Sequence, residues 1–107
     1  MKRDVEMTPP ATLLVVDDEP GITYSLKSTL TSPQLTVLTA GTAAEGLAMV
    51  RNHRPHVVLL DVRLPDMGGF DVCRRLKQSD PLREIPVLFT TGITELESKL
   101  EGFQALP

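Results

Sequence analysis

Three aspartates follow directly on two short apolar runs, and their carboxylates are the groups in this chain best suited to chemistry. Asp17 and Asp18 come after Leu13–Val16, and Asp61 comes after Val57–Leu60. Apolar runs rich in Val and Leu are typical of strands in a parallel sheet, whose carboxyl ends open onto the ligand crevice. Carboxylates brought together there repel one another unless a cation lies among them, and Mg²⁺ prefers such oxygen ligands beside phosphate. If the two strands are neighbours, the sequence predicts a Mg²⁺ site next to a phosphoryl group.

The rest of the chain alternates between strand-like runs and helix-like stripes, which is the order needed to position those carboxylates. Strands are predicted at Thr12–Asp17, Leu35–Ala40, His56–Asp61 and Ile85–Thr91. A helix is predicted after each strand, because apolar residues recur there every three or four positions. Strands that alternate with helices require right-handed crossovers and a parallel sheet. The expected fold is a doubly wound α/β sheet.

The predicted helices have start signals and apolar stripes of their own. The first begins at Pro20 and ends near Ser32-Pro33, and the second is capped by Thr42 with Glu45 three residues later. The stripes expected to face the sheet are Ile22, Leu26 and Leu30; Ala43, Ala44, Leu47 and Val50; Phe70, Cys73 and Leu76; and Leu96, Leu100 and Phe103. Residues 1–11 carry charges and two prolines, so we expect a flexible lead-in and a folded domain over 12–107.

Composition narrows the classes of function. The 107 residues carry 11 Lys and Arg against 14 Asp and Glu, a net charge of −3, without the basic stripe that nucleic-acid binding needs. No apolar run approaches the ~18 residues of a membrane span, and the N-terminus lacks a signal-peptide core. Cys73 is the only cysteine, so a reducing cytosol is expected, and its thiol is expected to be buried and inert. We therefore expect a cytoplasmic segment that itself binds neither nucleic acid nor a membrane.

Three longer motifs resemble the receiver domain of bacterial two-component response regulators. They are Leu14–Pro20, Val58–Phe70 and Ile85–Gly92, in the family's order and with its approximate spacing. The resemblance implies a flavodoxin-like fold with strand order 2-1-3-4(-5). It also implies a signalling switch, not an enzyme with a turnover substrate. Such a switch accepts a phosphoryl group from a sensor histidine kinase and signals to an output or kinase domain of the parent protein.

The resemblance implies a role for five residues. Asp61 would be the phosphoacceptor and would form an acyl phosphate. Asp18 would bind Mg²⁺ directly and Asp17 mostly through water, while Arg63 would lend its backbone carbonyl to the metal. Thr91 aligns with the hydroxyl residue that moves toward the phosphoryl oxygens and reports phosphorylation to the outer face. Phosphoryl transfer depends chiefly on positioning and charge neutralisation, which these residue types can supply.

The sequence departs from the family where a fifth strand would follow. The family ends that strand with a Lys before a Pro, whereas Lys77 and Lys99 lie on predicted helices away from the strand ends. We therefore expect a receiver whose fifth strand and fifth helix are missing, although a complete four-stranded protein is an alternative. Such a domain is expected to bind Mg²⁺ weakly and to switch poorly. The exposed sheet edge and the fourth helix are its candidate dimer surfaces.

Other functions for the same residues stay open on sequence alone. A degenerate receiver would only mediate protein contacts, which fits if the parent protein lacks the family Lys. A phosphatase of the haloacid dehalogenase type would need a carboxylate where this chain has Arg63. A nucleotide or flavin module would need a Gly-rich phosphate loop, whereas the turn after the first strand is acidic. Asp17-Asp18 alone would also suit a helix cap, and Asp66 and Asp71 are predicted to be turn and solvent-facing charges.

Overall fold

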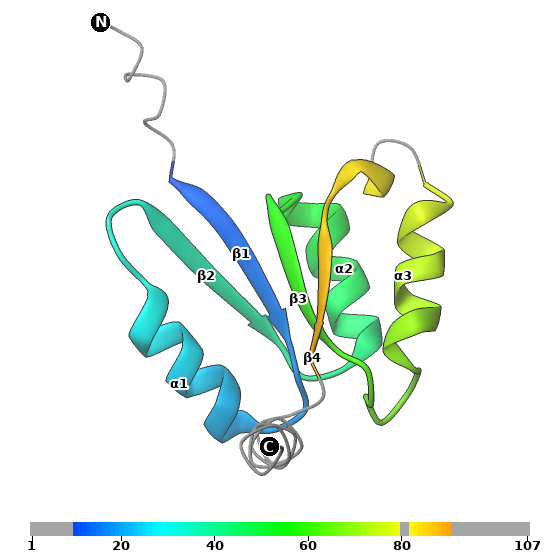
Figure 1. Cartoon of the computed structure of the whole chain (residues 1–107), viewed down its shortest axis with the longest axis horizontal. Helices are drawn as coiled ribbons and strands as arrows, with labels where there is room; N and C mark the ends of the chain where they lie inside the picture. The colour runs from blue at the N-terminus through cyan, green and yellow to red at the C-terminus, as the bar shows by residue number, and fades with distance from the viewer. Residues whose placement is uncertain (1–9, 80–81, 91–107) are drawn as a thin grey trace, which may run out of the picture.

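A parallel sheet lies at the centre of the molecule, between helices on its two faces (Figure 1). The computed structural model describes residues 10–79 and 82–90. In chain order its elements are β1 (Ala11–Val16), α1 (Pro20–Leu30), β2 (Leu35–Ala40), α2 (Ala43–His53), β3 (Val57–Asp61), α3 (Gly69–Lys77), the short 3₁₀ helix η2 (Leu82–Glu84) and β4 (Val87–Thr90). All pairings between the four described strands are parallel, in the order β2-β1-β3-β4. The predicted flavodoxin-like topology is therefore confirmed.

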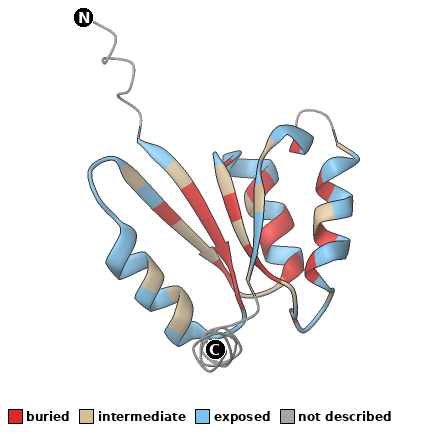
Figure 2. Cartoon of the chain, in the orientation of Figure 1, coloured by how far each residue is buried: buried red, intermediate tan, exposed pale blue. Residues whose placement is uncertain are grey.

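The two faces of the sheet have separate apolar cores, because successive side chains of a strand point to opposite faces. On one face, Leu26 of α1 packs against Leu13 and Val15 of β1 and Val37 of β2. On the other, α2 and α3 pack against a cluster that includes Leu14, Val16, Val58 and Leu60. Strand β1 is consequently buried along most of its length (Figure 2), as its continuous apolar run predicted. Within the described ranges, no helix is long and apolar enough to cross a membrane.

The boundaries of the elements differ from the predictions by a few residues. Strand β1 begins at Ala11, whose backbone N donates to Gln34 O at 3.0 Å, so this residue belongs to the sheet and not to the lead-in. Strand β3 begins at Val57, and α1 ends at Leu30, before Ser32-Pro33. Residues 1–9 and the predicted fourth helix, with Leu96, Leu100 and Phe103, lie outside the described residues.

The predicted stripes of α1 and α2 were right in part. In α1, Ile22 and Leu26 are half-buried as expected, but Leu30 is exposed because it lies in the last position of the helix. In α2, Ala44 is exposed and Gly46 takes its place on the buried face. Gly46 is accommodated there by its lack of a side chain, since a Cβ atom would lie 3.0 Å from Val16 Cγ2.

The predicted stripe of α3 was displaced from the true one by one residue at two positions. The buried residues are Gly69, Val72 and Leu76, whereas Phe70 is 59% exposed and Cys73 is only half-buried. Phe70 instead contacts Phe89 of β4, with ring centroids 4.7 Å apart. The prediction of a buried Cys73 was therefore wrong, because Cys73 lies on the same side of α3 as Phe70, which contacts Phe89.

Strand β4 is the last strand at its end of the described sheet. A strand with apolar residues on both faces is expected to be covered and not to lie at an open sheet edge. In the structure Leu88 is 57% exposed and Phe89 40% exposed. The described sheet thus contains the four predicted strands, and its β4 edge carries the more exposed apolar side chains.

Candidate functional site

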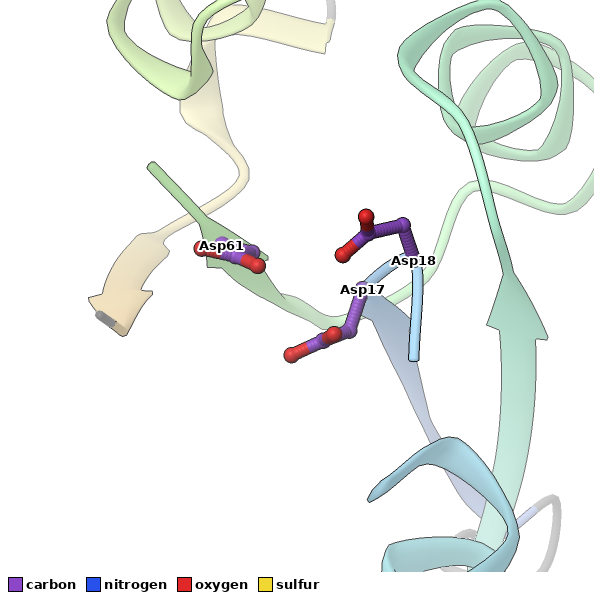
Figure 3. Close-up of side chains that lie close together, drawn as sticks. All are labelled: Asp17, Asp18 and Asp61. Carbon is purple, nitrogen blue, oxygen red and sulfur yellow. The ribbon is translucent and has the colours of Figure 1, made fainter. Parts of the chain in front are cut away.

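The carboxyl ends of β1 and β3 bring Asp17, Asp18 and Asp61 together (Figure 3). The two strands are neighbours with Val16 opposite Leu60, so Asp17 and Asp61 each lie one residue further along, and Asp18 follows Asp17. One carboxylate oxygen of each aspartate lies within 4.8 Å of those of the other two. Asp17 is 5% exposed and Asp61 6% exposed, whereas Asp18 faces solvent. We call these three residues the aspartate cluster.

Local hydrogen bonds orient the two buried carboxylates. Asp17 Oδ1 accepts from the backbone N of Glu19 at 3.0 Å, and Asp61 Oδ1 accepts from the backbone N of Arg63 at 3.0 Å. In both cases the donor lies two residues further on, in the turn that follows the strand. Each bond engages one carboxylate oxygen and fixes the rotation of the side chain. The strand ends therefore supply both the aspartates and the amides that hold them in place.

Electrostatics favour a cation in this cluster. Burial raises the pKa of Asp17, and the nearby charges of Asp61, Asp18 and Glu19 raise it further, against the opposing effect of the Glu19 amide. An ionised Asp17 is thus costly in the metal-free site, and a bound dication would reverse that cost. The donors are all carboxylate oxygens, which are the ligands that Mg²⁺ prefers. The residues present therefore fit a hard dication such as Mg²⁺.

The structure places the other predicted site residues less completely. Arg63 is exposed and follows Asp61 by two residues, and the role of its carbonyl stays a prediction. Thr91 lies outside the described residues. The preceding residue, Thr90, is paired with Asp61, and its carbonyl accepts from Val62 N at 3.0 Å, so β4 ends beside the aspartate cluster. Lys77 Nζ donates to the carbonyls of residues 83 and 85 at 2.8 and 3.0 Å, near the opposite end of β4, as expected for a lysine remote from the site.

Sequence reasoning missed the contact that Asp66 makes. Asp66 is exposed as predicted, but it is not merely a solvated charge. Its Oδ1 accepts from Ala43 N at 2.8 Å and its Oδ2 from Ala44 N at 3.0 Å, at the start of α2. These two amides lower the pKa of Asp66. No local pattern signals this contact, because the partners are more than twenty residues away in the sequence.

Gly69 is a second residue whose importance was missed. A Cβ atom at this position would lie 2.7 Å from Asp61 O and 2.7 Å from Val62 Cα, so α3 begins in direct contact with the backbone of the aspartate. The backbone N of Gly69 also donates to Val62 O at 3.0 Å. In the sequence, the pair Gly68-Gly69 indicates only a turn. A glycine directly before a helical stripe can also signal a close backbone approach.

The chain is similar to curated response regulators over part of their length. The family model of the response regulator receiver domain matches residues 13–106. TcrX of Mycobacterium tuberculosis is 40% identical over 96 residues, covering 90% of this chain and 40% of that protein. The response regulator PleD of Caulobacter vibrioides is 37% identical over 95 residues, covering 89% of this chain and 21% of that protein. The chain thus spans less than half the length of these relatives.

Solved structures give the same assignment. The chemotaxis response regulator CheY4 of Vibrio cholerae superposes with a TM-score of 0.71 at 30% identity, covering 89% of this chain and 79% of that one. The receiver domain of HemR from Leptospira biflexa gives a TM-score of 0.67 at 31% identity, covering 88% and 74%. Family model, relatives and topology agree, and the chain belongs to the response regulator receiver domain family.

Proposed function

We propose that this receiver domain accepts a phosphoryl group on Asp61 with the help of Mg²⁺. The observation that carries the proposal is the convergence of Asp17, Asp18 and Asp61 at the carboxyl ends of two neighbouring strands. Asp18 would bind the metal directly and Asp17 mostly through water, and Asp61 and the Arg63 carbonyl would complete the protein ligands. The oxygen-only donor set and the raised pKa of Asp17 both support a dication at this position.

Asp61 would act as the nucleophile. One oxygen of its carboxylate is held by the Arg63 amide, and the other would attack the phosphorus atom of a phosphohistidine. The new bond joins aspartate oxygen to phosphorus, the phosphorus–nitrogen bond breaks, and the departing imidazole keeps the electron pair. Bound Mg²⁺ would neutralise the equatorial phosphoryl oxygens. Thr91, next after β4, would supply a hydroxyl that responds to phosphorylation.

The partners follow from the same role. The phosphodonor would be a sensor histidine kinase, and the receiver would control an output or kinase domain in the parent protein. The domain would be a phosphoacceptor switch in the cytoplasm and not an enzyme with a turnover substrate. With a net charge of −3, this segment is proposed to bind neither nucleic acid nor a membrane directly.

Intact-mass spectrometry after incubation with Mg²⁺ and a small acyl-phosphate donor tests the proposal. We expect one added phosphoryl group on the wild type and none on Asp61→Asn, or on the wild type when the metal is chelated. Asp71→Asn is the matched control, because Asp71 is exposed on α3, where it pairs with Arg74. Phosphorylation of Asp61→Asn at the wild-type level would refute the assignment.

A further inference from the structure

We propose that Asp66 is a positioning residue that couples the metal-binding loop to helix α2. The inference rests on the proposed function, since it concerns the loop that carries Arg63. Asp66 itself does not touch the aspartate cluster. It acts by joining the tip of the β3–α3 loop to a second element of the fold, and so holds the Arg63 carbonyl in place.

The start of α2 is satisfied by two side chains from different parts of the chain. The first amides of a helix have no partner within the helix. Thr42 Oγ1 accepts from the Glu45 amide at 3.1 Å, which is an ordinary local cap. The Ala43 and Ala44 amides are left to the two oxygens of Asp66, at 2.8 and 3.0 Å. A carboxylate is also favoured here by the helix dipole, so this bidentate contact suits a fixed attachment.

The base of the β3–α3 loop is attached to β3. Gly69 N donates to Val62 O at 3.0 Å, and Arg63 and Gly68 form an antiparallel bridge. Arg63 N in turn donates to Asp61 Oδ1 at 3.0 Å. Arg63 therefore belongs to the base of a closed loop, and Asp66 lies at its tip, three residues further on. The loop is held at both ends, by β3 at the base and by α2 at the tip.

This arrangement connects the metal site with α2 energetically. If the hydrogen bonds between Asp66 and α2 hold the loop in the geometry that binds Mg²⁺, their loss must lower the affinity for Mg²⁺. By thermodynamic linkage, bound Mg²⁺ must then stabilise these hydrogen bonds by the same free energy. The Ala43 and Ala44 amides favour the ionised form of Asp66 and so lower its pKa. The sequence alone would treat Asp66 as a turn residue with no influence on α2.

Calorimetric Mg²⁺ titration of the wild type, Asp66→Ala and Asp71→Ala tests the coupling. Both variants lose one exposed carboxylate, but Asp71 contacts Arg74 on its own helix and not α2. We expect Asp66→Ala to weaken Mg²⁺ binding about 2- to 30-fold, the usual range for coupling through a packed network. Asp71→Ala is expected to stay within about twofold of the wild type, as is usual for an exposed ion pair. Asp66→Asn keeps one acceptor oxygen and should fall between the wild type and Asp66→Ala.

Amide hydrogen exchange supplies a readout that a purely structural cap would not change. In the wild type, Mg²⁺ should slow hydrogen exchange of the Ala43 and Ala44 amides. In Asp66→Asn, Mg²⁺ should slow this exchange less. Equal Mg²⁺ affinities of wild type and Asp66 variants, or amides unaffected by Mg²⁺ in a wild type that binds it, would overturn the inference alone. An equal loss in the Asp71 control would also overturn it, because charge and not position would then explain the result. A wild type that binds no Mg²⁺ would overturn both this inference and the proposed function.

Discussion

Replacing Gly69 with Ala should destabilise the protein, although alanine is the better helix former. Gly69 is the first residue of α3, and the new Cβ atom would lie 2.7 Å from both Asp61 O and Val62 Cα. Ordinary contact distances are about 3.5 Å or more, so α3 would have to move by about 0.8 Å. Both obstructing atoms belong to the backbone of β3 and its exit turn, so neither can rotate away as a side chain would.

The size of the effect follows from three contributions. Overpacking of this kind costs about 1–3 kcal/mol. Moving α3 would also strain the hydrogen bond from Gly69 N to Val62 O, now 3.0 Å long, which is worth about 0.5–1.5 kcal/mol. The helix preference of alanine offsets at most about 1 kcal/mol of this. With the full offset, we expect a net loss of about 0.5–3.5 kcal/mol in the free energy of unfolding.

Urea unfolding followed by circular dichroism measures this loss as a lower midpoint at unchanged slope. Gly21→Ala is the matched control, because Gly21 lies in the first turn of α1 and no described atom lies within 4 Å of the Cβ position. That variant should be as stable as the wild type or up to about 1 kcal/mol more stable. If Gly69→Ala were as stable as Gly21→Ala, the close contact between α3 and the Asp61 backbone would be disproved.

Two further changes test the electrostatics and the capping of the site. Because the folded-state pKa of Asp17 is raised, ionising this residue costs folding free energy as the pH rises through that pKa. In metal-free buffer, Asp17→Asn should therefore be more stable than the wild type at neutral pH. At acidic pH, Asp17 is protonated in both the folded and the unfolded state. Thermal melts there should show equal stability for the two proteins. A difference that persists unchanged in acid would contradict the assignment. Thr42→Ala removes the acceptor of the Glu45 amide and should lower the free energy of unfolding by about 1 kcal/mol, measured in urea; an unchanged midpoint would show that the cap is replaced.

The convergence of the aspartates was predictable because it follows from strand geometry. Apolar runs ending at Asp17 and Asp61 indicated buried parallel strands, and the carboxyl ends of neighbouring parallel strands meet at one edge. The sequence pattern did not show that these two strands are neighbours in the sheet. The resemblance to receiver domains indicated it, through the family's strand order. The helix cap at Thr42 was predictable for a similar reason, since its partner Glu45 is three residues away.

The contacts that were missed join residues far apart or depend on the exact rotation of a helix. Asp66 reaches α2 across a long sequence separation, and a turn signal gives no information about such a partner. The face of α3 was displaced because Phe70 is apolar and yet pairs with Phe89 at the surface, while Gly69 takes the buried position. Periodicity shows that a helix has an apolar face. Where apolar residues are neighbours in the sequence, however, the position of that face is uncertain by one residue.

The most direct measurement is to locate the phosphoryl group chemically. After incubation with Mg²⁺ and an acyl-phosphate donor, hydroxylamine would attack the acyl carbon, release phosphate and leave a hydroxamate on the modified side chain. Peptide mass mapping would then identify the residue. We predict a hydroxamate on Asp61 alone, with Asp17 and Asp18 unmodified. A hydroxamate on either of those residues, or a phosphoryl group that resists hydroxylamine, would contradict the role of Asp61 as phosphoacceptor.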